Sequence, residues 1–220
     1  SLFPAKPSFM FPLTSAYGLS DLSAPSPTPL ISSLQQSNQH SLTLLFIGSL
    51  TNSFDFQPLA EALSSPHIST QVRLLIAGDG PVRTLLNDCF RYHENVIFTD
   101  WIPPNQLTYL YSLADICVLP YIIHDDFSMS YPNKSIDALK NSKPILTSIS
   151  QGSLPDLFVR YPCGLSYSSP CDLESKLLFL STNRKSLKLM SHSARAAYEE
   201  IFSSELIYPA FYNHITQLSS

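Results

Sequence analysis

Charge is scarce in this chain, and its balance is acidic. Charged residues make up 14% of the 220 residues, with 13 basic and 17 acidic side chains and a net charge of −4. Proteins that bind nucleic acid usually carry a basic face or stripe, so this balance argues against nucleic acid as a partner. A small basic cluster, Arg184, Lys185 and Lys188, is typical of a solvated helix face and is weak as a membrane-docking surface.

Paired cysteines and long apolar runs are lacking as well. The four cysteines have no paired metal-ligand spacing, and Cys117 lies within an apolar run, so we expect reduced core thiols and a cytoplasmic protein. No apolar run reaches the roughly 20 residues that span a bilayer. The N-terminus lacks a signal-peptide pattern, because Lys6 is followed by a proline-broken segment.

Two regions differ in composition. Residues 1–40 are rich in proline and serine and have no sustained periodicity, which predicts a linker or arm. Residues 41–220 alternate short apolar runs with amphipathic stretches and are expected to form one domain with C-terminal helices.

The apolar runs predict six strands: Leu42–Ile47, Val72–Ala77, Val96–Phe98, Ile116–Leu119, Pro144–Ser148 and Gly164–Tyr167. Helices are predicted around them: Phe56–Leu63, Pro81–Phe90, Leu107–Ala114, Tyr131–Lys143 with its preceding turn, Leu154–Val159, Asp172–Leu180, Ser186–Phe202 and Tyr208–Leu218. This alternation predicts an α/β fold, a doubly wound, Rossmann-like parallel sheet of about six strands with helices on both faces. Ligands of such sheets bind beyond the carboxyl ends of the strands, near the point where strand order reverses.

The turn and helix after the fourth strand form a candidate phosphate site. Pro132 suits the edge of a helix, and Asn133 or Ser135 is a candidate N-cap. Free backbone N–H groups at a helix start attract anions, and Lys134 adds a full positive charge there. Asp137 follows one turn later as an acceptor for hydroxyl groups. Together these features favour a nucleotide or nucleotide-sugar.

Two other motifs leave alternatives open. Gly78-Asp79-Gly80 either lets a nucleotide approach the backbone or forms an ordinary tight turn. The dinucleotide fingerprint is incomplete, since no third glycine follows at the required spacing, which disfavours hydride chemistry. His124-Asp125-Asp126 offers metal ligands or an acid–base group, but it is also typical of a solvated loop.

In order, these segments resemble retaining glycosyltransferases of the GT-B fold, of the glycosyltransferase group 1 or family 4 type, in the branch that builds surface polysaccharides. The resemblance rests on the spacing of Leu44–Leu50, Leu74–Pro81, Asn95–Phe98, Ala114–Pro120, Pro132–Leu139, Lys143–Leu146 and Cys163–Leu165. It covers about residues 42–218 and looks like the C-terminal, donor-binding half of such an enzyme.

The resemblance implies a role for each matching position. Lys134 and the amides near Asn133 and Ser135 would hold the donor diphosphate, beside Gly48 and Ser49. Asp137 would bind the ribose hydroxyls. The base would be bordered by Trp101, Ile102 and the glycine turn of Gly78 and Gly80.

The implied chemistry needs neither a metal nor a cofactor, because Lys134 and the helix start would stabilise the leaving diphosphate, with Lys134 and Asp137 as the catalytic pair. The sequence departs from the family at several positions. Met129 and Asp137 occupy the positions of the family's two glutamates, Ser49 replaces an arginine, and the lysine that commonly accompanies that arginine is missing.

The implied activity is transfer of a hexosyl group, with retention, from a nucleotide-diphosphate sugar to a glycan or lipid-linked acceptor. The N-terminal acceptor domain is expected to be absent here, with residues 1–40 as the interdomain connection, so the chain alone is expected to be inactive. Peripheral contact of the full protein with the inner face of the membrane is left open. The alternatives are a catalytically degenerate nucleotide-sugar-binding module with an assembly or regulatory role, and another enzyme class such as a nucleotide-sugar epimerase.

Overall fold

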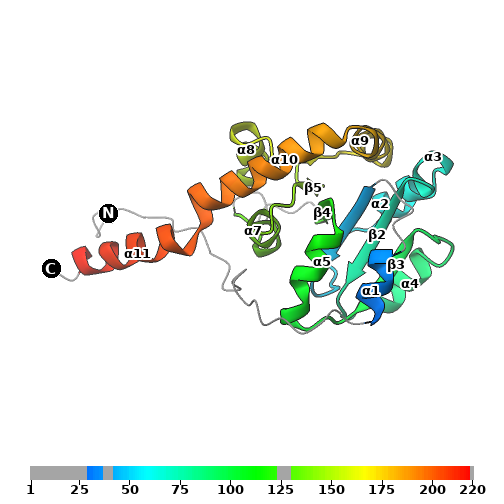
Figure 1. Ribbon diagram of the computed structural model, residues 1–220, viewed down its shortest axis with the longest axis horizontal. Helices are drawn as coiled ribbons and strands as arrows, with labels where there is room; N and C mark the ends of the chain where they lie inside the picture. The colour runs from blue at the N-terminus through cyan, green and yellow to red at the C-terminus, as the bar shows by residue number, and fades with distance from the viewer. Residues whose placement is uncertain (1–28, 37–41, 123–129, 219–220) are drawn as a thin grey trace, which may run out of the picture.

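A central sheet of six parallel strands organises the protein (Figure 1). The computed structural model describes residues 29–36, 42–122 and 130–218. The strand order is β3-β2-β1-β4-β5-β6, so chain order reverses between β1 and β4. The strands are β1 Leu42–Ile47, β2 Val72–Ala77, β3 Val96–Asp100, β4 Ile116–Leu119, β5 Ile145–Thr147 and β6 Gly164–Ser166. The predicted doubly wound fold is confirmed.

Helices alternate with the strands and follow them. They are α1 Pro29–Gln36, α2 Gln57–Leu63, α3 Pro66–Ser69, α4 Arg83–Cys89, α5 Leu107–Leu113, α7 Asn133–Lys140, α8 Ser153–Arg160, α9 Pro170–Thr182, α10 Arg184–Ala197 and α11 Ser204–Leu218. A 3₁₀ turn, Pro104–Gln106, precedes α5, and a π-helical turn, Tyr198–Phe202, joins α10 to α11. Figure 1 shows α11 projecting away from the sheet.

Both faces of the sheet are buried against helices. Neighbouring side chains of a strand point to opposite faces, so they belong to different apolar clusters. In β1, Leu44 and Phe46 belong to the apolar cluster under α2, α4 and α9. Leu45, between them, belongs to the cluster under α5, α7 and α8. All three are fully buried or nearly so. This two-sided burial explains why the strands appear in the sequence as continuous apolar runs.

Several helices begin or end away from their predicted residues. The sequence predicted no helix before Leu42, but the structure contains α1, where Leu34 is buried and its carbonyl accepts a hydrogen bond from Arg73 Nη1 at 3.3 Å. The short helix α3 was not predicted either. The predicted start of α4 at Pro81 is wrong by two residues, because the chain first turns through Val82.

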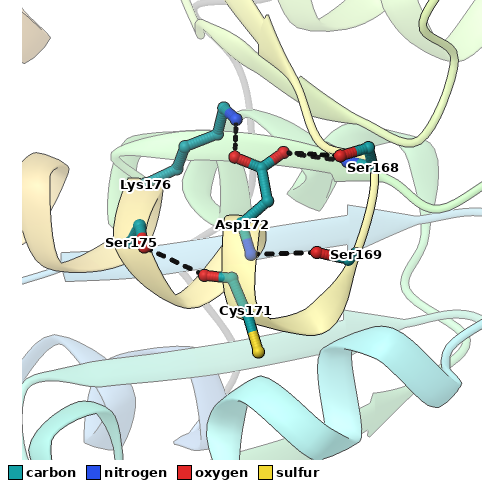
Figure 2. A network of polar contacts seen from close by, with 6 residues as sticks. All are labelled: Ser168, Ser169, Cys171, Asp172, Ser175 and Lys176. Atoms are coloured by element: carbon teal, nitrogen blue, oxygen red, sulfur yellow. Dashed lines mark hydrogen bonds and ion pairs between the residues drawn. The ribbon is translucent and has the colours of Figure 1, made fainter.

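The N-terminus of α9 is fixed by a polar network (Figure 2). The Ser169 hydroxyl accepts the Asp172 amide hydrogen bond at 3.2 Å, an N-cap of the usual kind. The Asp172 carboxylate accepts hydrogen bonds from the backbone and hydroxyl of Ser168 and pairs with Lys176. The Lys176 hydrogen bond, with the Ser168 amide, lowers the pKa of Asp172 below its ordinary value.

Loss of this cap should weaken the whole domain, because α9 packs against α2 and β1. We expect Ser169→Ala to lower the free energy of unfolding by about 1 kcal/mol, measured by urea denaturation. Ser175→Ala is the matched control, since Ser175 only donates to the Cys171 carbonyl one turn back and caps nothing. Equal effects of the two substitutions would show that the cap does not matter.

Candidate functional site

The loops after β1 and β2 touch through their backbones at the carboxyl edge of the sheet. Gly48, Gly78 and Gly80 all have positive φ angles, of 135°, 142° and 159°. A Cβ atom added at Gly78 would lie 2.0 Å from the Gly48 carbonyl oxygen, and one added at Gly80 would lie 2.2 Å from the Leu50 carbonyl oxygen. Contact between the two loops therefore already requires glycine at positions 78 and 80.

Lys134 reaches across the point where strand order reverses. It lies in the first turn of α7, after β4, yet a Cβ atom added at Gly48, after β1, would lie 2.4 Å from its Nζ atom. The sequence placed these two residues at one site, and the structure brings them together. Ser49, next in the chain, is exposed beside them.

Aromatic rings lie beneath the Lys134 ammonium group. Its Nζ atom is 5.4 Å from the centre of the Phe54 ring and 5.9 Å from that of Phe46. Phe54 also forms an antiparallel bridge with Tyr121, which ties the loop after β1 to the end of β4. Sequence reasoning missed both Phe54 and Tyr121. The only signal available was an aromatic residue shortly after each of two strands.

The charge of Lys134 is poorly compensated. Burial lowers its pKa from the ordinary 10.5, and Asp137 offsets this only in part. Within the described part of the chain, no carboxylate forms an ion pair with the Lys134 ammonium group. A partly buried cation over rings and beside a bare backbone is a site that an anion would stabilise.

The start of α7 differs from the prediction. Asn133 and Ser135 do not cap the helix, because Pro132 is the N-cap residue and no side chain bonds to the free amides. Asn133 is exposed, whereas Ser135 is fully buried. The hydroxyl and the amide of Ser135 both donate to the Pro132 carbonyl, at 2.6 and 2.8 Å. The amides left at the helix start are therefore those of Asn133 and Lys134.

Asp137 lies one turn after Lys134 and is half-buried. Its charge helps to raise the pKa of Tyr111 and Cys117, behind burial and other causes, and to oppose the lowering at Lys134. Among the described residues its carboxylate forms no hydrogen bond or ion pair. Its acceptor oxygens therefore remain available.

The far side of the site is built from the ends of β2 and β3. Trp101 is 66% exposed, and Ile102 follows it half-buried. Asp100, before them, has a left-handed φ of 56°, and its backbone carbonyl accepts a hydrogen bond from Gly78 at 2.8 Å. Arg83, which sequence reasoning missed, donates to the Gly78 carbonyl at 3.1 Å and pairs with the Asp100 carboxylate at 2.6 Å.

The remaining sequence candidates cannot be placed relative to this site from the part of the chain that the structure describes. His124, Asp125, Asp126 and Met129 lie outside the described residues. No cluster of metal-ligating side chains occurs in the described ranges. No helix among them is long and apolar enough to cross a membrane.

A cavity of about 370 Å³ lies elsewhere, at the amino ends of β2 and β3. It is separated from Lys134 by the length of the sheet, because parallel strands start at one edge and end at the other. We do not assign the site there. Its lining residues are Leu63, Ser64, Ser69, Thr70, Tyr92, His93, Glu94 and Asn95.

Comparison with known protein families gives one match for this chain. The sequence profile described as "Glycosyl transferases group 1" matches residues 41–183, well over half of the chain. No curated protein matches the sequence.

Solved structures with the same fold are distant in sequence. Sucrose-phosphate synthase from Thermosynechococcus elongatus is 18% identical, with a TM-score of 0.69 over 87% of this chain and 49% of that one. HepE from Anabaena, in complex with UDP, is 15% identical, with a TM-score of 0.68 over 85% of this chain and 52% of that one. WaaG, a glycosyltransferase of lipopolysaccharide biosynthesis, is 18% identical, with a TM-score of 0.60 over 78% and 47%. The chain thus spans about half the length of these neighbours.

The burial of Lys134 predicts an unusual effect on stability. Because its pKa is lowered in the folded state, the charged form is disfavoured by folding at neutral pH. We expect Lys134→Met to raise the free energy of unfolding at pH 7. This gain should shrink as pH rises from the lowered pKa of Lys134 towards 10.5, because native Lys134 then becomes neutral.

The matched control is Lys143→Met. Burial lowers the pKa of Lys143 too, but its Nζ atom donates to the Ala114 carbonyl at 2.8 Å. Removing that donor leaves a carbonyl without its partner, so this variant should be destabilised. Chemical denaturation at several pH values measures both. A Lys134→Met variant less stable than the native chain at pH 7 would contradict the expected cost of burying this charge.

Proposed function

The chain belongs to the glycosyl transferases group 1 family, and from this premise we propose that it is a donor-binding domain for a nucleotide-diphosphate sugar. Transfer of a hexosyl group from that donor, with retention, to a glycan or lipid-linked acceptor of a surface polysaccharide is the reaction we assign to the whole protein. Lys134 and Asp137 are its proposed catalytic residues.

The observation that carries the proposal is the Lys134 ammonium group itself. It lies against Gly48 at the strand-order reversal, partly buried and without an ion pair among the described residues. The free amides of Asn133 and Lys134 at the start of α7 add partial positive charge beside it. A diphosphate supplies the negative charge that these groups lack, and the charge grows as the sugar–phosphate bond breaks.

The other candidate site residues would contact different parts of the donor. Gly48 and Ser49 would flank the diphosphate, and the Asp137 carboxylate would accept hydrogen bonds from ribose hydroxyls. Trp101, Ile102 and the Gly78–Gly80 turn would border the base. HepE is a neighbour in complex with UDP, which makes UDP the first nucleotide to test.

The acceptor is proposed to bind outside this chain. The chain spans about half the length of its structural neighbours, which favours a second domain as a partner and low activity of this chain alone. α11 projects from the sheet (Figure 1). Its Tyr208 and Tyr212 side chains are 57% and 68% exposed. We assign it to the support of that second domain. A cytoplasmic location, peripheral to the membrane, fits an acceptor carried on lipid.

A second candidate function is a degenerate donor module with an assembly or regulatory role. It is favoured by Met129, which stands where the family has its first glutamate. The two functions differ in turnover, because the degenerate module binds the donor but releases no nucleotide from it. Nucleotide release by the intact parent protein, measured with a panel of donors, separates them.

Binding of a nucleoside diphosphate should depend on Lys134. We expect the native chain to bind UDP or another nucleoside diphosphate by calorimetry, and Lys134→Ala to weaken binding by about tenfold to a hundredfold, the range for a charged hydrogen-bond partner. Lys188→Ala is the matched control, because Lys188 is exposed on α10 and its substitution removes the same positive charge. Equal affinity of native and Lys134→Ala chains would refute the assignment.

Binding should also take up a proton at alkaline pH. The diphosphate favours the charged form of Lys134, so its pKa rises from the lowered value on binding. Affinity should therefore be highest below the lowered pKa and fall as pH rises through it. Calorimetry in buffers of different ionisation enthalpy measures the uptake. Native-like uptake by Lys134→Met would show that another group titrates.

A further inference from the structure

Arg83 links the turn after β2 to the end of β3. Its Nη1 atom donates to the Gly78 carbonyl at 3.1 Å, and its Nη2 atom pairs with Asp100 Oδ1 at 2.6 Å. Its Nε atom donates to Asn87 Oδ1 at 3.2 Å, and the guanidinium carbon lies 4.5 Å from the centre of the Phe98 ring. The Arg83 side chain is only 20% exposed. Three of its five N–H donors are engaged within the protein, one of them by the Gly78 backbone carbonyl.

Asp100 needs such support. It adopts a left-handed φ of 56° without being glycine, a conformation that costs about 1 kcal/mol or more. Its side chain is 79% exposed and holds no described partner other than Arg83. Two hydrogen bonds therefore fix the backbone turn at Asp100. One runs from Arg83 to the Asp100 carboxylate, and the other from the Gly78 amide to the Asp100 carbonyl.

The backbone turn at Asp100 sets the orientation of the next two residues. Trp101 and Ile102 follow Asp100 directly, and their backbone N–H and C=O groups make no hydrogen bond to described residues. Unpaired backbone groups beside an exposed indole ring can read the edge of a flat heteroaromatic ligand. Such reading is selective only when the groups are held within a fraction of an ångström.

We propose that Arg83 is a positioning residue for base selectivity. By locking Gly78 to Asp100, it holds the Trp101–Ile102 backbone in the orientation that distinguishes one nucleobase from another. This inference rests on the proposed function. It separates two tasks: Lys134 provides affinity for any diphosphate, and Arg83 provides the choice of base without touching the ligand.

The test compares affinity ratios among bases. The full chain and its variants are titrated by calorimetry with UDP, CDP, ADP and GDP, and with pyrophosphate as a ligand without a base. We expect Arg83→Met to reduce the ratio between the tightest and the weakest nucleotide by about tenfold, the scale of one or two hydrogen bonds. Its affinity for pyrophosphate should not change. A merely structural role would weaken all five ligands alike.

Three further variants make the outcome decisive. Arg83→Lys keeps the charge but not the forked geometry, so it should lose selectivity as well. Asp100→Ser removes the same contact at an exposed side chain, so it serves if Arg83→Met does not fold. Arg91→Met is the matched control, because Arg91 is exposed and stacks only on Tyr92, at 5.0 Å. It should leave the ratio unchanged.

The failures of the two proposals are distinguishable. If the native chain binds no nucleoside diphosphate, the proposed function fails, and this inference fails with it. If the native chain binds them all equally, or if Arg83→Met and Asp100→Ser keep the native ratio, only the role of Arg83 is refuted.

Discussion

The position of β1 at the centre of the sheet determines the geometry of the site. β1 pairs with β2 on one side and β4 on the other, and the chain winds away from it in both directions. Its carboxyl end is therefore the place where loops from both halves meet. Gly48 lies there in contact with the loop after β2 and with α7. Its carbonyl oxygen occupies the position that a Cβ atom at Gly78 would take, and Lys134 Nζ lies where a Cβ atom at Gly48 itself would be. A larger residue at this position would be strained by the φ of 135° and would displace the Lys134 ammonium group.

The helix that carries Lys134 is held at both ends by the segment before α11. At its start, the Tyr131 ring packs edge-on against Phe202, with centroids 4.9 Å apart. At its end, Arg195 Nη1 donates to the Lys140 carbonyl at 3.0 Å. Phe202 belongs to the π-helical turn and Arg195 to α10, the elements that lead into α11. The orientation of Lys134 thus depends on the C-terminal segment as well as on β4.

Sequence reasoning succeeded where one chemical rule dominates. Strands β1, β2 and β4 have the predicted bounds because each is a continuous apolar run, buried on both faces. The family resemblance implied that Lys134 lies beside Gly48, and the strand order is consistent with this placement. The N-cap at Pro132 was missed, because serine and asparagine nearby offered better capping side chains, and their actual partners depend on the local backbone. Phe54 and Arg83 were missed because their partners come from other strands, and a linear pattern does not reveal those contacts.

The cations of this domain differ in what neutralises them. Arg83, Arg184 and Arg195 each pair with a carboxylate of the protein, whereas Lys134 pairs with none among the described residues. Lys134 contributes little to the stability of the fold, since burial disfavours its charge and the aromatic rings compensate only weakly. A charged lysine at this position is physically sensible if its counter-ion comes from a bound ligand. Arg83 differs, because its guanidinium is paired with Asp100 and bonded to the Gly78 carbonyl, and a guanidinium held in this way is suited to fixing the backbone. The proposed function and the proposed role of Arg83 thus assign charge for the diphosphate and geometry for the base to two different side chains at the same edge of the sheet.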